Sequence, residues 1–168
     1  MHPVAQLLTW FPDCDFAILE HGLAPHGRDY QLVVEHSGFD QPGRHRLTLT
    51  HVVELTVTTA VRDDVWPRSW DDLFTGYAAW ERAGHPDGYV WGTNWSLAYP
   101  GWTVVEPSAT AARWTERLGH PMFEARVETD RFQLQCCFHA LRTELLDDRT
   151  DIVSRVIIPL DNPSGGAA

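Results

Sequence analysis

Histidine and cysteine are the residue types here that could ligate a metal, and they come closest together at residues 136–139. On an extended strand Cys137 and His139 point to the same side, next to Cys136. His51, on the apolar face of an earlier run, could meet them. A structural zinc site needs four ligands, usually from paired short spacings, and the chain has no CxxC or HxxxH motif. We therefore predict no metal and no cofactor, and expect the two cysteines to be small buried hydrophobes.

A second group of candidate residues surrounds a turn in an aromatic segment. Six of the eight tryptophans lie between residues 66 and 102, and the turn at 85–88 opens a run of alternating aromatic and polar residues. The candidate binding residues are His85, Asp87, Tyr89, Trp91, Asn94 and Trp95. Two interpretations stay open, because tryptophans usually pack in cores, yet Trp and Tyr also line pockets and interface hot spots.

Two other features suggest catalysis but have simpler explanations. Cys14 lies between Asp13 and Asp15, whose carboxylates oppose formation of a nucleophilic thiolate. Asp71 and Asp72 could form an acid pair, but at the start of a helix they point about 100 degrees apart and stabilise the positive end of the helix dipole. We predict a structural role for each.

The charge balance excludes several functions. The chain has 13 basic residues, all arginine, against 23 acidic residues, for a net charge of -10. Nucleic-acid binding through phosphate neutralisation is therefore not expected. The absence of lysine excludes a Walker-type phosphate loop and Schiff-base catalysis. The start of the chain has no signal-peptide pattern, and no stretch is long and apolar enough for a membrane span, so we expect a cytoplasmic protein.

Strand patterns dominate the predicted elements. Residues 45–61 alternate as one long strand, with Leu47, Leu49, His51, Val53, Leu55 and Val57 on one face, and its length predicts a bulge or bend near 52–54. Further strands are expected at 14–20, 29–35, 89–97, 102–106, 123–128, 132–139 and 152–160, with a turn at 99–101.

Two helices interrupt the strands. The first is expected from the N-cap Ser69 to Arg82, with Leu73, Tyr77 and Trp80 as its packing stripe; the second from Ala109 to Leu118, with Ser108 as N-cap and Gly119 as its stop. Together these elements predict an α+β fold: a mostly antiparallel sheet of seven to eight strands with two helices packed on it. The chain length fits a single domain, 1–160, followed by a disordered tail, 161–168.

The order of several aromatic and polar segments resembles the uncharacterised bacterial YxiG-like family. The segments are FPDCDFAILEHG (11–22), RDYQLVVE (28–35), LTHVVELTVTT (49–59), SWDD (69–72), GYVWGTNWSLAYPGW (88–102) and ETDRFQLQCCFHAL (128–141). The family has no established activity, so the resemblance assigns no catalytic residue. It implies genes near polymorphic toxin systems. Residues 11–20 are also distantly similar to the Phe-His-Asp start of some immunity proteins, with Pro12 in place of the histidine.

Charge and resemblance together favour a binding protein over an enzyme. The leading hypothesis is an immunity-like or toxin-associated protein that binds a basic, toxin-like protein partner, because an acidic surface speeds association with a basic target. The alternative is a small-molecule-binding protein or enzyme with a pocket lined by Tyr89, Trp91 and Trp95, and with His85, Asp87 or His139 as polar groups. A structural homo-oligomer is a third alternative.

Overall fold

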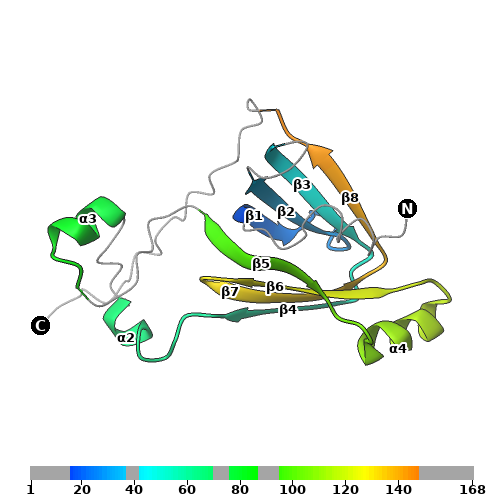
Figure 1. Cartoon of the computed structure of the whole chain (residues 1–168). Coiled ribbons are helices and arrows are strands. Elements are labelled where there is room, and N and C mark those ends of the chain that lie inside the picture. Colours follow the sequence, from blue (N-terminus) through cyan, green and yellow to red (C-terminus); the bar gives the residue numbers. More distant parts are fainter. Residues whose placement is uncertain (1–15, 37–41, 70–75, 87–94, 148–168) are drawn as a thin grey trace, which may run out of the picture.

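The computed structural model is a strand-rich fold in two layers, and it describes residues 16–36, 42–69, 76–86 and 95–147 (Figure 1). The strands are β1 (Phe16–Leu23), β2 (Tyr30–His36), β3 (Gly43–Thr50), β4 (Glu54–Thr59), β5 (Ser96–Val104), β6 (Phe123–Thr129), β7 (Phe132–Phe138) and β8 (Ala140–Leu145). The helices are α2 (Trp66–Ser69), α3 (Tyr77–Arg82) and α4 (Ala109–Leu118).

The eight strands of the described residues belong to one sheet, in the order β4-β7-β6-β5-β1-β2-β3-β8. Every neighbouring pair is antiparallel. The predicted α+β class with a mostly antiparallel sheet is therefore confirmed. The expected strand at 152–160 and the tail at 161–168 lie outside the described residues. No helix in the described ranges is long and apolar enough to cross a membrane.

Two long bent strands, β3 continuing into β4 and β7 continuing into β8, connect the two layers of the sheet. β3 pairs with β8 and β4 with β7, while only residues 51–53 separate β3 from β4 and only His139 separates β7 from β8. At the bend, Val53 N donates to Cys137 O at 2.9 Å and His139 N donates to Thr50 O at 2.9 Å. The predicted break near 52–54 is confirmed, and Figure 1 shows β1, β2, β3 and β8 lying over β4, β5, β6 and β7.

The core fills the space between the layers. Leu47 and Leu49 of β3 belong to the same core cluster as Leu134 and Phe138 of β7, and all four side chains are fully buried. The alternation predicted through residues 45–61 fails after the bend. His51 has a positive φ of 52° and is exposed, and the edge strand β4 leaves Val57 uncovered. A bend that moves the chain to the other layer cannot keep one continuous apolar face.

The aromatic helix differs from its prediction at its start, whereas its end at Arg82 is as predicted. Ser69 ends α2 instead of capping a helix, and α3 begins after Gly76. No α3 residue is buried and Tyr77 is 50% exposed, so the expected packing of Tyr77 and Trp80 on the sheet is wrong. Figure 1 shows α3 standing apart from the two layers.

The second helix has the predicted boundaries. Ser108 Oγ accepts a hydrogen bond from Ala111 N at 2.9 Å, and Gly119 ends α4 with a φ of 70°. α4 packs against the outer face of the lower layer, where its Ala111 joins Met122 and the β7 residue Cys137 in a small buried cluster. The local capping signals were sufficient here because each acts within four residues.

Candidate functional site

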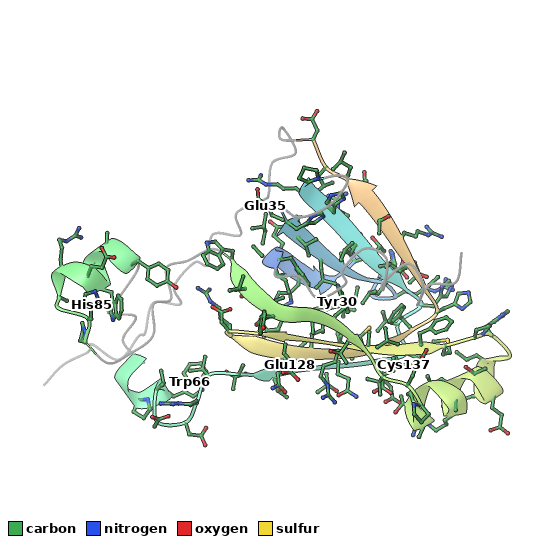
Figure 2. All side chains as sticks on the ribbon, viewed as in Figure 1. Tyr30, Glu35, Trp66, His85, Glu128 and Cys137 are labelled. Atoms are coloured by element: carbon green, nitrogen blue, oxygen red, sulfur yellow. The ribbon has the colours of Figure 1, made fainter. Side chains whose placement is uncertain are left out.

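The candidate site around residues 85–95 is only partly described. Asp87, Tyr89, Trp91 and Asn94 lie outside the described residues. His85 is exposed, has a positive φ of 57°, and its ring centroid lies 4.4 Å from that of Trp80. Figure 2 places His85 beside α3, away from the strands. It therefore belongs to the helical segment and not to the sheet surface.

Strand β5 carries an exposed apolar row that the sequence interpretation missed. Ser96 and Ala98 point into the core, while Leu97 and Tyr99 point outward and are 39% and 69% exposed. Trp95, directly before the strand, is half-buried. The strand continues through Pro100 and Gly101, where a turn was predicted, with a register shift between Ala98 and Trp102. The predicted strand stopped at Leu97 and placed Tyr99 in a turn. Extending the strand to Tyr99 would have put both side chains on one face and found the row.

The weak metal candidates do not form one ligand set. His51 and His139 do meet at the bend, with ring centroids 5.7 Å apart and an edge-to-face orientation. His139 Nδ1 donates to the carbonyl oxygen of Pro121 at 2.8 Å. Cys137 is instead buried beneath α4. Within the described ranges, no three His, Cys, Asp or Glu side chains are placed to hold a metal ion.

The two adjacent cysteines face opposite sides of β7, and both are buried as predicted. Cys136 belongs to the core between the layers, and burial raises the pKa of its thiol. Burial also raises the pKa of Cys137 to about 11, and the carboxylates of Glu124 and Glu54 act in the same direction. At neutral pH neither thiol is an effective nucleophile.

This shift predicts slow alkylation of Cys137. Its ordinary pKa is 9.0, against about 11 in the fold, so the thiolate fraction at pH 8 falls about 100-fold on folding. In a Cys14→Ser chain, we expect iodoacetamide at pH 8 to modify Cys137 at least 100-fold more slowly in the folded state than in urea, as followed by tandem mass spectrometry. Rapid alkylation of the folded chain would contradict the buried position.

The same shift makes stability depend on pH in the alkaline range. The folded chain retains the Cys137 proton up to a higher pH than the unfolded chain does. The contribution of the neutral thiol is therefore complete below pH 9 and is lost as the pH rises from 9 to about 11.

A polar network lies next to Cys137 beneath α4. Glu124 is only 6% exposed, and its carboxylate accepts hydrogen bonds from Ser108 Oγ and Gln135 Nε2. Ser108 therefore has two roles, because its hydroxyl caps α4 and also satisfies a buried carboxylate. The sequence indicated only the cap, since Glu124 is sixteen residues away.

On the other side of Cys137, Glu54 anchors α4 to the edge strand. Its carboxylate accepts a hydrogen bond from Trp114 Nε1 at 2.6 Å and forms an ion pair with Arg113. The bond from Trp114 and the charge of Arg113 lower the pKa of Glu54. Arg117 lies over the Trp114 ring, 4.7 Å from its centroid. The arginines of α4 are thus turned toward β4 and Trp114.

The opposite side of α4 forms a pocket of about 470 Å³ with the end of β5 and the start of β6. Its lining residues are Val104, Val105, Glu106, Ser108, Ala111, Ala112, Thr115, Glu116, Met122 and Phe123. Among the described residues no tryptophan or tyrosine lines it, and Trp95 of the alternative hypothesis is not part of it. The signal in the sequence was the stripe of small residues at 108, 111, 112 and 115, at helical spacing.

Comparison with known proteins gives a family and no activity. No curated protein matches the sequence. A crystal structure of an uncharacterized protein from Neisseria gonorrhoeae is similar with a TM-score of 0.39 and 6% identity, over 79% of this chain and 93% of that one. This likeness is too low to support an argument. The family model of YxiG-like proteins matches residues 2–153, in agreement with the segments from 11 to 141 that suggested it. The chain belongs to the YxiG-like protein family.

Proposed function

We propose that this chain is a binding protein that holds a basic protein partner by surface complementarity, in the manner of an immunity protein. The observation that carries the proposal is the exposed apolar row of β5, Leu97 and Tyr99, preceded by Trp95. An exposed tyrosine beside other large apolar side chains on a sheet surface is typical of an interface hot spot, where a few residues supply most of the binding energy.

Two hydrogen bonds to Asp130 fix the backbone of β5 at Leu97, in the middle of this row. Asp130 Oδ1 accepts from Leu97 N at 2.9 Å, and Asp130 N donates to Leu97 O at 3.1 Å. The inward neighbours Ser96 and Ala98 are buried in the same strand. A rigid strand loses little conformational freedom when a partner binds, which favours affinity.

The net charge of -10 supports a basic partner. The described ranges contain 14 acidic residues and 11 arginines, and the rest of the chain contains 9 acidic residues and 2 arginines. The net charge is thus -3 in the described ranges and -7 in the remaining segments. Such a charge would act mainly on the rate of association, through long-range steering that salt screens.

A capture experiment with matched variants tests the proposal. We expect the tagged chain to retain a basic, toxin-like protein from a lysate of a bacterium that carries the gene, and the Leu97→Ser/Tyr99→Ser variant to retain at least tenfold less. A loss of about 1.4 kcal/mol produces a tenfold effect, and hot-spot residues commonly exceed it.

The control makes the same kind of change at two other exposed leucines, Leu23→Ser/Leu145→Ser, which are 53% and 55% exposed. This variant should capture the partner as the original chain does. Equal capture by the β5 variant would refute the role of the row. Recovery of no basic protein, with the neighbouring genes expressed, would refute the function.

A further inference from the structure

The pocket beside α4 combines an apolar floor with an acidic rim. Ala111 and Met122 are buried at its floor, with Val104 and Phe123 partly buried beside them. Glu106 and Glu116 also line the pocket but are exposed. The space of about 470 Å³ exists because α4 presents Ala111 and Ala112 to it instead of large side chains.

Among the described residues, the charged side chains that line the pocket are both negative. The ten lining residues include two glutamates and no arginine or histidine. Behind them, the buried carboxylate of Glu124 accepts hydrogen bonds from the neutral donors Ser108 and Gln135. Gln135 Oε1 in turn accepts a hydrogen bond at 3.5 Å from Arg126, which is exposed and does not line the pocket. Arg113 and Arg117 come from the other side of α4, where they contact Glu54 and Trp114. The field in the pocket therefore favours a positive charge.

The hydroxyl groups of the lining already serve the protein. Ser108 Oγ accepts from Ala111 N and donates to Glu124, and Thr115 Oγ1 accepts from Met122 N at 2.9 Å. A ligand would consequently find apolar contacts at the floor and carboxylates at the rim. This arrangement matches a short alkyl chain that ends in a cation, because the chain can be buried while the charged end stays near water.

We propose that this pocket binds an aliphatic cation, an alkylammonium or alkylguanidinium group, between α4 and the β5–β6 strand ends. The site shares no residue with the β5 row, which lies at the start of the strand, and Figure 1 shows α4 next to the other end of β5. The proposal therefore goes beyond protein binding through the row and does not depend on it.

A titration with three four-carbon probes tests the site. Chemical shifts of backbone amides are followed in ¹H-¹⁵N spectra at pH 7 and low salt with n-butylammonium, 1-butanol or butanoate. We expect butylammonium to shift the amides of residues 105–106, 111–116 and 122–123 and to bind more tightly than butanol, with butanoate weakest. Equal binding of butylammonium and butanol, or shifts elsewhere, would overturn the proposal.

Charge-neutral variants separate the carboxylates from general effects of net charge. Glu106→Gln/Glu116→Gln should weaken butylammonium binding roughly threefold to tenfold, as expected for two exposed charge interactions, and leave butanol binding unchanged. The control Glu81→Gln/Glu128→Gln removes the same charge outside the pocket and should have little effect. Ala112→Leu should weaken both ligands by occupying the space. Unchanged butylammonium binding in the first variant contradicts the acidic rim.

One further probe, compared with butylammonium, identifies how the cation is presented. N-acetyl-lysine methylamide carries the butylammonium group on a peptide backbone, whereas butylammonium itself is free. Binding of both would indicate a lysine or arginine side chain of a protein, and binding of the free amine alone would indicate a small metabolite-sized amine. Because these titrations need no protein partner, a failed capture experiment and a failed pocket experiment are independent results.

Discussion

Replacing Phe138 with alanine is expected to lower the free energy of unfolding by about 3–5 kcal/mol, the usual range for a large buried aromatic side chain. Phe138 is fully buried, belongs to the main core, and its ring centroid lies 6.4 Å from that of Phe123. It also ends β7, one residue before the bend into β8. The missing ring would leave a cavity where the two layers are joined. The neighbouring side chains are held by paired strands and can fill this cavity only partly.

Urea unfolding followed by tryptophan fluorescence measures this loss. The matched control is Tyr99→Ala, which removes another aromatic ring but from a position that is 69% exposed; its effect should stay within about 0.5 kcal/mol. If the two variants had equal stability, the position of Phe138 between the layers would be wrong. The control has a second use, because Tyr99→Ala should impair partner capture while the chain stays folded.

Replacing Ser108 with alanine is expected to lower the free energy of unfolding by about 1–3 kcal/mol. The loss of an N-cap contributes about 1 kcal/mol. The rest comes from Glu124, which would lose one of its two hydrogen-bond donors while it remains buried. The expected loss therefore exceeds that of an N-cap whose side chain bonds only to the helix.

Two variants of α4 distinguish this double role from a general effect on the helix. Ser108→Thr retains the hydroxyl and should preserve most of the stability, whereas Thr110→Ala changes a residue that does not cap α4 and should stay within about 0.5 kcal/mol of the original chain. Urea unfolding again provides the measurement. A Ser108→Ala chain as stable as the original would show that neither the cap nor the bond to Glu124 contributes.

The two proposed sites lie at opposite ends of β5. The apolar row lies at the start of β5 and the pocket begins at its end, Val104, next to α4. The Leu97→Ser/Tyr99→Ser variant should therefore lose partner capture but bind butylammonium as the original chain does. The Glu106→Gln/Glu116→Gln variant should still capture the partner through the row.

The sequence by itself determined the features that depend on neighbouring residues. Ser108 and Gly119 define α4, because a hydroxyl that caps and a glycine that adopts positive φ act within one turn. The length of the run at 45–61 required a break, and the break occurs at residues 51–53. The burial of Cys136 and Cys137 and the antiparallel class likewise followed from strand patterns.

Only the tertiary structure decided which strands pair and which faces are covered. Alternation shows that Leu97 and Tyr99 share a side of β5, but the packing of the two layers determines that this side is outside. The same limit explains the error at Tyr77 and Trp80, where a good local helix signal carried no information about contact with the sheet. Glu124 meets Ser108, and His51 meets His139, through contacts between residues far apart in the chain. Such contacts depend on the fold as a whole, because no short window of sequence contains both partners.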